Sequence, residues 1–365
     1  MKALFIVLAL LAANSQAATL VDLAGRQVTI PAKVERIVLG EGRMLTSLTI
    51  LDRDLPSKRI VGMLGDFEQL DPGAYAQYLQ VYPRLDQIAR LGKSSASFSV
   101  EETIRLKPDL AVFSLRGHGP GVNDVATLRK LQSAGVTVVY VDFTQDPLKN
   151  TPQSIRVLGR MLGKEKAAEQ YIDFYQQEMA RVSTGLSKVK RYPSVFLESR
   201  VGLDKSCCET ITHAMLGRFV DAAGGNNIAK TKVPGAHGVV NVEFLLTEQP
   251  EFYIATAIGN PQSAQSNSPR IALGAGITPA MAQKTLRKAM QRTGIAELDA
   301  VRNGKTYALS HQFNYSAANV VAVQAIAKWL HPEQFAQLDP NDTLQRFYQR
   351  FQPVALNGTY WAALQ

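Results

Sequence analysis

The strongest constraint on the fold is that two sequence patterns recur, in the same order, in the two halves of the chain. The first pattern is an apolar run followed by Glu, one further residue and Arg, and it occupies 38–43 and 195–200. In the second, Val-Glu is followed seven residues later by Pro and an acid and then by an apolar strand; it occupies 100–113 and 242–255. The repetition predicts two similar lobes. Two facing lobes enclose a cleft, which is the usual place for a small ligand.

A long helix is predicted between the two copies. No Gly or Pro occurs from Glu165 to Ser183, and apolar residues recur there at steps of three and four. A helix of about 22 residues is roughly 33 Å long, so it would act as a stiff spine, whereas a Gly/Ser linker would be a loose tether. The alternative is a long core helix within one lobe. Thr151-Pro152 is typical of the start of the helix before it.

Strand patterns alternate with helical ones, which favours α/β lobes with parallel sheets. We therefore expect two Rossmann-like lobes joined by one long rigid helix, with the ligand cleft between them. The predicted boundaries are an N-terminal lobe over 18–162, a linking helix over 163–188 and a C-terminal lobe over 189–365.

Residues 1–17 have the pattern of a cleavable signal peptide. Lys2 is followed by an apolar run over 3–12 and by Ser15-Gln16-Ala17, a small-x-small cleavage pattern. The apolar run is shorter than the roughly 20 residues that a membrane span needs. No Cys follows at the cleavage point, so a lipid anchor is not expected. These features predict a soluble, exported protein of the periplasm.

The chain is basic, with a formal charge of +9, and loss of Lys2 with the signal leaves +8. Such an excess is compatible with nucleic acid, an anionic surface or an anionic small ligand. The basic residues are scattered and form no run interleaved with aromatic residues. Nucleic acid is therefore not an expected partner, and solubility accounts for most of the excess.

Several residues of the predicted cleft follow strands directly, and parallel strands place their ligand sites at their carboxyl ends. Three are arginines, whose planar forks match carboxylate, catecholate or phosphate oxygens. We expect Arg43 and Arg200 to face each other across the cleft; the alternative is local pairing with Glu41 and Glu198. The expected ligand-binding residues at these strand ends are Glu41, Arg43, Arg116, His118, Phe143, Arg200, His311 and Tyr315.

Cys207 and Cys208 are neighbours, so they cannot staple distant segments. They either form a ring with each other or remain as thiols, and their loop is expected to border the ligand at the mouth of the second lobe. A metal site is not predicted, because partners at ligand spacing are missing. The chain also lacks the Gly-x-Ser-x-Gly, phosphate-loop and His-Glu-x-x-His motifs. We therefore expect neither an enzyme nor a resident cofactor.

Four motifs in order carry a family resemblance. They are Arg36-Ile37-Val38, Leu106-Lys107-Pro108-Asp109-Leu110, Gly224-Gly225-Asn226 and the segment 300–307. Together they resemble the helix-spined (class III) substrate-binding proteins of ABC importers, which serve ferric siderophores, haem and vitamin B12. The resemblance implies a partner permease in the inner membrane. It also implies that Glu101 and Glu243, one in each lobe, dock onto permease arginines.

The chain departs from that family in one respect. Tryptophan, which often lies against the ligand there, occurs only at Trp329 and Trp361, and Ser95 stands where an aromatic residue is expected. This weakens a corrin ligand and makes Ser95 a candidate for ligand contact. With the arginines, it favours an anionic ferric siderophore, iron being present only as part of the bound chelate.

Two other functions stay open at this point. One is haem binding, with His118, His311 or Tyr315 as axial ligand. The other is an exported enzyme that releases or reduces chelated iron with Cys207 and Cys208. The protein is expected to be a monomer.

Overall fold

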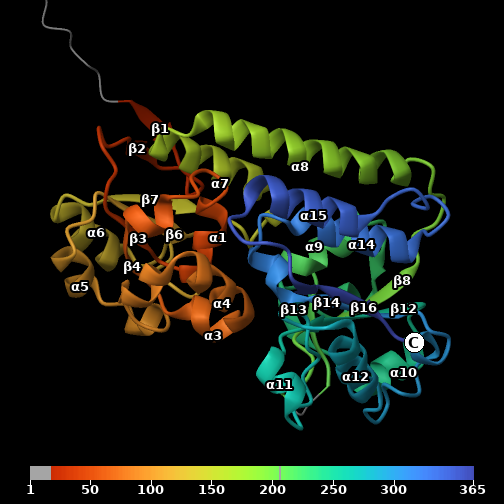
Figure 1. Cartoon of the computed structure of the whole chain (residues 1–365). Helices are drawn as coiled ribbons and strands as arrows, with labels where there is room; N and C mark the ends of the chain where they lie inside the picture. Colours follow the sequence, from red (N-terminus) through yellow and green to blue (C-terminus); the bar gives the residue numbers. More distant parts are fainter. Residues whose placement is uncertain (1–17, 205–206) are drawn as a thin grey trace, which may run out of the picture.

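The computed structural model describes residues 18–204 and 207–365, so the predicted signal peptide lies outside the described residues. Two α/β lobes stand side by side, and the long helix α8 (Glu165–Leu186) runs across the top of both (Figure 1). The predicted fold class, two α/β lobes with a long helix between the repeats, is confirmed. Gly163, left-handed at φ 64°, ends α7 (Pro147–Leu162) and separates it from α8.

The N-terminal lobe is built on one parallel sheet of order β5-β4-β3-β6-β7. The strand order reverses between β3 and β6, and this switch point is where an open α/β sheet binds its ligand. The strands of the lobe are β1 (Thr19–Val21), β2 (Gln27–Thr29), β3 (Ile37–Leu39), β4 (Ile60–Met63), β5 (Ala89–Arg90), β6 (Leu110–Ser114) and β7 (Thr137–Val141). Its helices are α1 (Leu45–Leu48), α2 (Leu55–Lys58), α3 (Asp66–Leu70), α4 (Pro72–Val81), α5 (Val100–Arg105), α6 (Val125–Ser133) and α7.

The C-terminal lobe has a mixed sheet of order β11-β9-β8-β12-β14-β16, with β10 beside β8. The central strands β8, β12 and β14 are parallel, and the edges are antiparallel. Its strands are β8 (Ser194–Glu198), β9 (Glu209–Ile211), β10 (Asn226–Asn227), β11 (His237–Val239), β12 (Phe252–Ala257), β13 (Gly274–Ala275), β14 (Thr306–Ser310), β15 (Gly358–Thr359) and β16 (Trp361–Ala363). Its helices are α9 (Met215–Ala222), α10 (Val242–Glu248), α11 (Pro261–Gln265), α12 (Pro279–Met290), α13 (Asp299–Arg302), α14 (Asn319–Leu330) and α15 (Pro340–Phe351).

The predicted helix start at Thr151-Pro152 is wrong, because α7 begins at Pro147 and Pro152 lies inside it. A proline lacks the N–H that would bond the carbonyl four residues earlier. That carbonyl belongs to Leu148, and the Tyr175 hydroxyl of α8 lies 3.4 Å from it. The same hydroxyl donates to Asn319 Oδ1 of α14 at 2.8 Å, which is the shorter contact.

The repeated Pro-acid step has a structural purpose in both lobes. Asp109 Oδ2 accepts the N–H groups of Glu35 and Arg36, both at 2.8 Å, just before β3. In the other lobe, Glu251 Oε1 accepts the N–H of Ser194 at 3.3 Å, at the start of β8. Each acid therefore holds the beginning of the neighbouring parallel strand, which sets the register of the pair.

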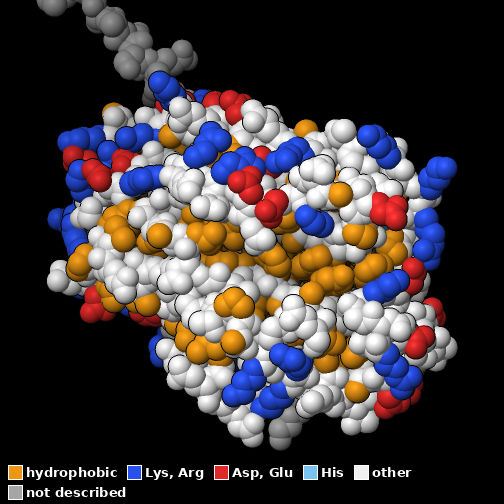
Figure 2. All heavy atoms as spheres, turned by 45° about the vertical axis from the view of Figure 1, so that its right-hand side comes forward, with side chains coloured by type: hydrophobic (Ala, Val, Ile, Leu, Met, Phe, Trp, Pro, Cys, Tyr) orange, Lys and Arg blue, Asp and Glu red, His pale blue; other side chains and the backbone are white. Residues whose placement is uncertain are grey.

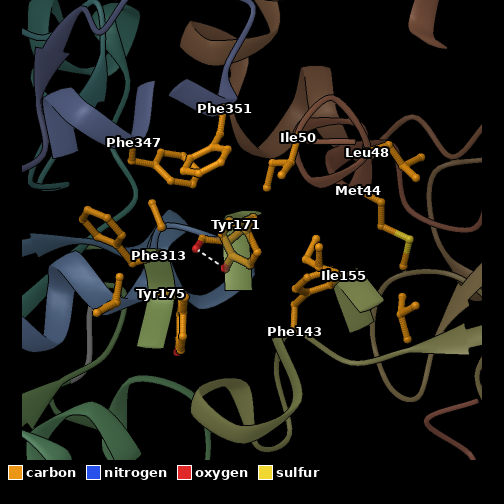
Figure 3. Packing of buried hydrophobic residues seen from close by; sticks show 14 of the residues in the cluster. Met44, Leu48, Ile50, Phe143, Ile155, Tyr171, Tyr175, Phe313, Phe347 and Phe351 are labelled. Atoms are coloured by element: carbon orange, nitrogen blue, oxygen red, sulfur yellow. Dashed lines mark hydrogen bonds between the residues drawn. The ribbon is translucent and has the colours of Figure 1, made fainter. Parts of the chain in front are cut away.

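One apolar cluster joins the two lobes. It contains Ile37 of β3, Val195 of β8, Tyr171 of α8 and Phe347 of α15. Figure 3 shows Phe347, Phe313 and Tyr171 packed on one side and Met44 and Ile155 on the other. Because close-packed interiors resist deformation, this shared core couples the lobes along the spine.

Charged side chains are dispersed over the surface. On the face in Figure 2, apolar side chains form a band across the molecule, with Lys and Arg both above and below it and acidic groups among them. This agrees with the interpretation of the basic excess as a general property of the surface.

We predict that Asp109→Ala lowers the free energy of unfolding by about 1–2 kcal/mol, because two backbone donors lose their acceptor. Asp109→Asn, which keeps an acceptor oxygen, should lose less. Urea unfolding measures the change as a shift in midpoint at unchanged slope. The control is Asp54→Ala, which removes only an exposed pairing with Lys58. Equal midpoints for Asp109→Ala and Asp54→Ala would contradict the strand-holding role.

Candidate ligand site

Arg43 follows β3 and is held in place within the N-terminal lobe. Its side chain is only 6% exposed, and its Nε donates to Asp66 Oδ2 at 2.8 Å. Asp66, at the start of α3, also accepts the Gly42 N–H. The sequence analysis did not identify Asp66, although an acid directly after β4 is itself a strand-end signal.

The guanidinium of Arg43 spans the gap between the lobes. Its Cζ lies 3.7 Å from the ring centroid of Tyr315, which ends the turn His311–Tyr315 after β14. Its buried Nη2 has no hydrogen-bond partner among the residues that the structure describes, and it stands 3.7 Å from Glu41 Oε2. The predicted local pairing with Glu41 and a contact between the lobes are therefore both present.

Glu41 is a buried carboxylate at the same point of the fold. Its Oε1 accepts the His118 N–H at 3.1 Å, from the turn after β6. A Cβ at Gly117 would lie 1.6 Å from this oxygen, so only glycine allows the approach. Burial raises the pKa of Glu41 to about 7, and the charge of Arg43 offsets part of that rise. One backbone donor thus engages Oε1, while Oε2 stands beside the Arg43 guanidinium.

The sequence match of Arg43 with Arg200 is one residue out of register. Ile37 pairs with Leu110 in the first sheet, whereas Val195 pairs with Phe252 in the second. Leu110 and Phe252 each follow the repeated acid, so Ile37 corresponds to Val195. Gly42, and not Arg43, therefore corresponds to Arg200.

The two Glu-Arg pairs consequently differ. Glu198 bonds both Nη atoms of Arg292, at 2.7 and 2.8 Å, instead of Arg200. Arg200 pairs with Glu209 of β9, and its side chain is 40% exposed. The alternative of a local ion pair between Arg200 and Glu198 is not realised, because Glu198 is taken by Arg292 and Arg200 by Glu209.

The charges of Arg43 and Arg200 nevertheless affect the pKa values of the same two histidines and one tyrosine. Burial, together with the charges of Arg200 and Arg43, lowers the pKa of His311 to about 3. The pKa of His118 is lowered by burial and by the same two arginines. Burial raises the pKa of Tyr315, and both arginine charges oppose that rise. Strand ends of both lobes therefore converge on one site.

His311 is committed to protein contacts. Asn314 Nδ2 lies 3.1 Å from its Nε2, and Thr256 Oγ1 lies 3.0 Å from its Nδ1. Asn314 Oδ1 accepts the Leu216 N–H, so its amide nitrogen is the group facing the ring. Nε2 is then an acceptor and Nδ1 a donor. Both ring nitrogens are occupied, which disfavours His311 as an axial haem ligand.

Arg116 and His237 complete this edge from opposite lobes. Arg116 is exposed after β6 and forms no ion pair within the described parts of the chain. The pKa of His237 on β11 is lowered by burial and by the charges of Arg200 and Arg116, while Glu209 opposes them. His237 was not among the predicted ligand residues.

The remaining candidates are placed as follows. Phe143 is 4% exposed and packs in the apolar core beside Ile155 (Figure 3), so its side chain gives no support for the expected ligand contact. Ser95 is exposed in a short turn after β5. Cys207 and Cys208 are joined in a disulfide, and Cys208 is buried.

The two predicted docking glutamates occupy equivalent positions. Glu101 and Glu243 are each the second residue of a helix, α5 and α10, whose N-cap is Ser99 or Asn241. Both are exposed, and Glu101 contacts Lys130 at 3.5 Å. In Figure 1, α5 and α10 lie at opposite ends of the molecule, away from α8.

The periplasmic binding protein family matches residues 68–312, which is more than half of the chain. The chain belongs to this family. No protein with curated function matches it in sequence. Membership identifies a binding protein rather than a known enzyme, of the type that works outside the cytoplasm and delivers its solute to an ABC permease. No helix in the described ranges is long and apolar enough to cross a bilayer.

Solved structures of the same fold agree with this membership. The TroA-like periplasmic binding protein FepB from Veillonella parvula is 25% identical, with a TM-score of 0.83 over 95% of this chain and 99% of that one. CeuE of Helicobacter pylori, in a Ni-His complex, is 15% identical, with a TM-score of 0.65 over 93% and 96%. The haem-binding protein RhuT from Roseiflexus is 18% identical, with a TM-score of 0.59 over 83% and 100%.

The buried Glu41 predicts a specific pH dependence of stability. A carboxyl whose pKa is about 7 when folded and 4.5 when unfolded stabilises the fold fully below pH 4.5 and loses that contribution as the pH rises through 7. The loss amounts to about 3 kcal/mol. The glutamine of Glu41→Gln does not titrate. The difference in melting temperature, variant minus parent, should therefore increase from pH 4.5 to pH 8. A constant difference across this range would contradict the assignment.

Proposed function

We propose that this periplasmic binding protein captures an anionic ferric siderophore and delivers it to an inner-membrane ABC permease. The observation that supports the ligand class is the convergence of Arg116 and Arg200, from opposite lobes, on one site. Arginine forks bind the paired oxygens of carboxylates and catecholates. No bond is made or broken; the protein selects by shape, charge and ring contact.

The charge balance of the site points to Arg116 as the main anion-binding group. Arg43 is paired with Asp66 and Glu41, and Arg200 is paired with Glu209. An anionic ligand gains least where a protein carboxylate already compensates the cation. Arg116 has no such partner among the described residues, so its charge is available to the ligand.

Haem is the second candidate, because a haem-binding protein shares the fold. The ring of His118 is partly exposed and 6.1 Å from that of Tyr315. No side-chain hydrogen bond of His118 is present in the described structure, so its imidazole is open to a metal. A Soret band that forms with haem and is lost in His118→Ala would favour this function over the siderophore.

An iron-reducing activity receives little support. Such an enzyme would use Cys207 and Cys208 as thiols, but the two are joined, and the described residues contain no free cysteine.

We predict that Arg116→Ala weakens binding of an anionic ferric catecholate about 10- to 100-fold, corresponding to about 1.5–3 kcal/mol for one charge-assisted contact. Binding of a neutral ferric hydroxamate should change much less. Titration calorimetry on the mature protein measures both. Arg105→Ala is the control, because Arg105 lies on the outer helix α5 and pairs with Glu102. Unchanged affinity for the catecholate in Arg116→Ala would overturn the charge-based selection.

If Glu101 and Glu243 dock the protein onto its permease, the double variant Glu101→Ala, Glu243→Ala should reduce uptake and leave ligand affinity unchanged. Removal of two exposed carboxylates should weaken electrostatic complementarity with permease arginines. Uptake is measured in cells that lack the native protein. The control pair, Glu169→Ala with Glu333→Ala, removes two other exposed carboxylates. Normal uptake with the first pair would contradict docking through these residues.

A further inference from the structure

A second space lies between the lobes, next to the strand-end site. It is a cavity of about 70 Å³ whose lining includes Arg43 and Tyr315, the pair that closes the gap between the lobes. His118, Arg116 and Arg200 are not part of that lining. One water molecule needs a cavity volume of about 10–15 Å³, so this cavity has room for several groups of that size. It is large enough for the end of an aminoalkyl chain.

The lining is aromatic. Seven of its residues carry aromatic rings, and they come from the N-terminal lobe, from the segment after β14, from α15 and, for Tyr360, from between β15 and β16. The hydroxyls of Tyr348 and Tyr360 lie 2.9 Å apart, and the Tyr78 hydroxyl donates to Gln352. Several aromatic rings around one small space are the composition of the sites in which proteins hold organic cations.

One carboxylate accompanies these rings. Asp71 is the single acidic residue of the lining among the residues that the structure describes. Its Oδ1 accepts the Ala74 N–H at 3.3 Å as the N-cap of α4. Its Oδ2 accepts no hydrogen bond from a described residue. Asp71 lines the same cavity as Tyr78, Tyr348 and Tyr360, and its charge adds to the rise that burial causes in the pKa of all three.

The electrostatics of this space favour a cation. Burial raises the pKa of Asp71 to about 6, and the Ala74 N–H and the charge of Arg43 offset only part of that rise. Arg43 is the single basic residue of the lining in the described structure, but Asp66 and Glu41 already hold its guanidinium. A cation beside Asp71 would restore the charge balance that burial removes.

We propose that this cavity is an ammonium-binding subsite, in which Asp71 pairs with the cation and the tyrosine rings surround it. The inference rests on the proposed function in one respect, namely that the ammonium group belongs to the bound siderophore. It identifies the chelate as one that carries an aminoalkyl arm in addition to the anionic groups facing Arg116 and Arg200. A free small alkylammonium ion has the same chemistry and is the other source.

The test uses the mature protein with two matched pairs of probes. The first pair is n-butylammonium and its neutral analogue n-butanol. The second pair is a ferric catecholate with a pendant aminoalkyl arm and the same chelate N-acetylated. Asp71→Asn is the informative variant, because asparagine is as good an N-cap as aspartate and preserves α4. Asp86→Asn, an exposed change beyond the end of α4, is the control.

The amine-bearing chelate should bind the parent about 10-fold or more tighter than its acetylated form. Asp71→Asn should abolish that preference and leave affinity for the acetylated chelate unchanged. Binding of n-butylammonium alone, lost in Asp71→Asn, would support the subsite with a free amine as its occupant. Equal binding of n-butanol and n-butylammonium, or an amine preference that survives in Asp71→Asn, would overturn it. Failure of both chelates to bind the parent would overturn the siderophore function instead.

Discussion

The buried guanidinium of Arg43 is the interaction around which the site is organised. A cation that is 6% exposed needs compensating groups, and three segments supply them. Asp66 after β4 and Glu41 after β3 provide charge from the same lobe, while Tyr315 provides a ring face from the other. The lobes therefore meet through a cation–π contact at the edge where their strands end.

The position of Arg43 in turn determines what the neighbouring groups can do. Its charge contributes to keeping His311 and His118 neutral, although burial is the larger cause for both rings. It offsets part of the cost of burying Glu41. Because it is already paired, it contributes less to anion binding than its sequence position suggests. The exposed Arg116 takes over that role in our proposal.

The rest of the fold keeps this geometry stiff. The apolar cluster continues from β3 through α8 to α15, so movement of one lobe against the other disturbs shared packing. The Tyr175 hydroxyl of α8 donates to Asn319 of α14, and Asn319 in turn donates to Thr151 of α7, which adds a polar tie among the three helices. This interior, together with the spine, therefore resists rotation of one lobe against the other.

The sequence alone determined the two lobes, the long helix and the strand-end edge that carries the candidate site, because periodicity, Pro-acid steps and strand order are local or repeated signals. It did not determine which side chains meet. Glu198 pairs with Arg292, which is 94 positions away, and Arg200 pairs with Glu209. Phe143 turned inward to the core, and Asp71, which no motif marked, lines a space made by three distant segments. Only tertiary structure decides such contacts, since side-chain direction depends on strand register and on packing partners far along the chain.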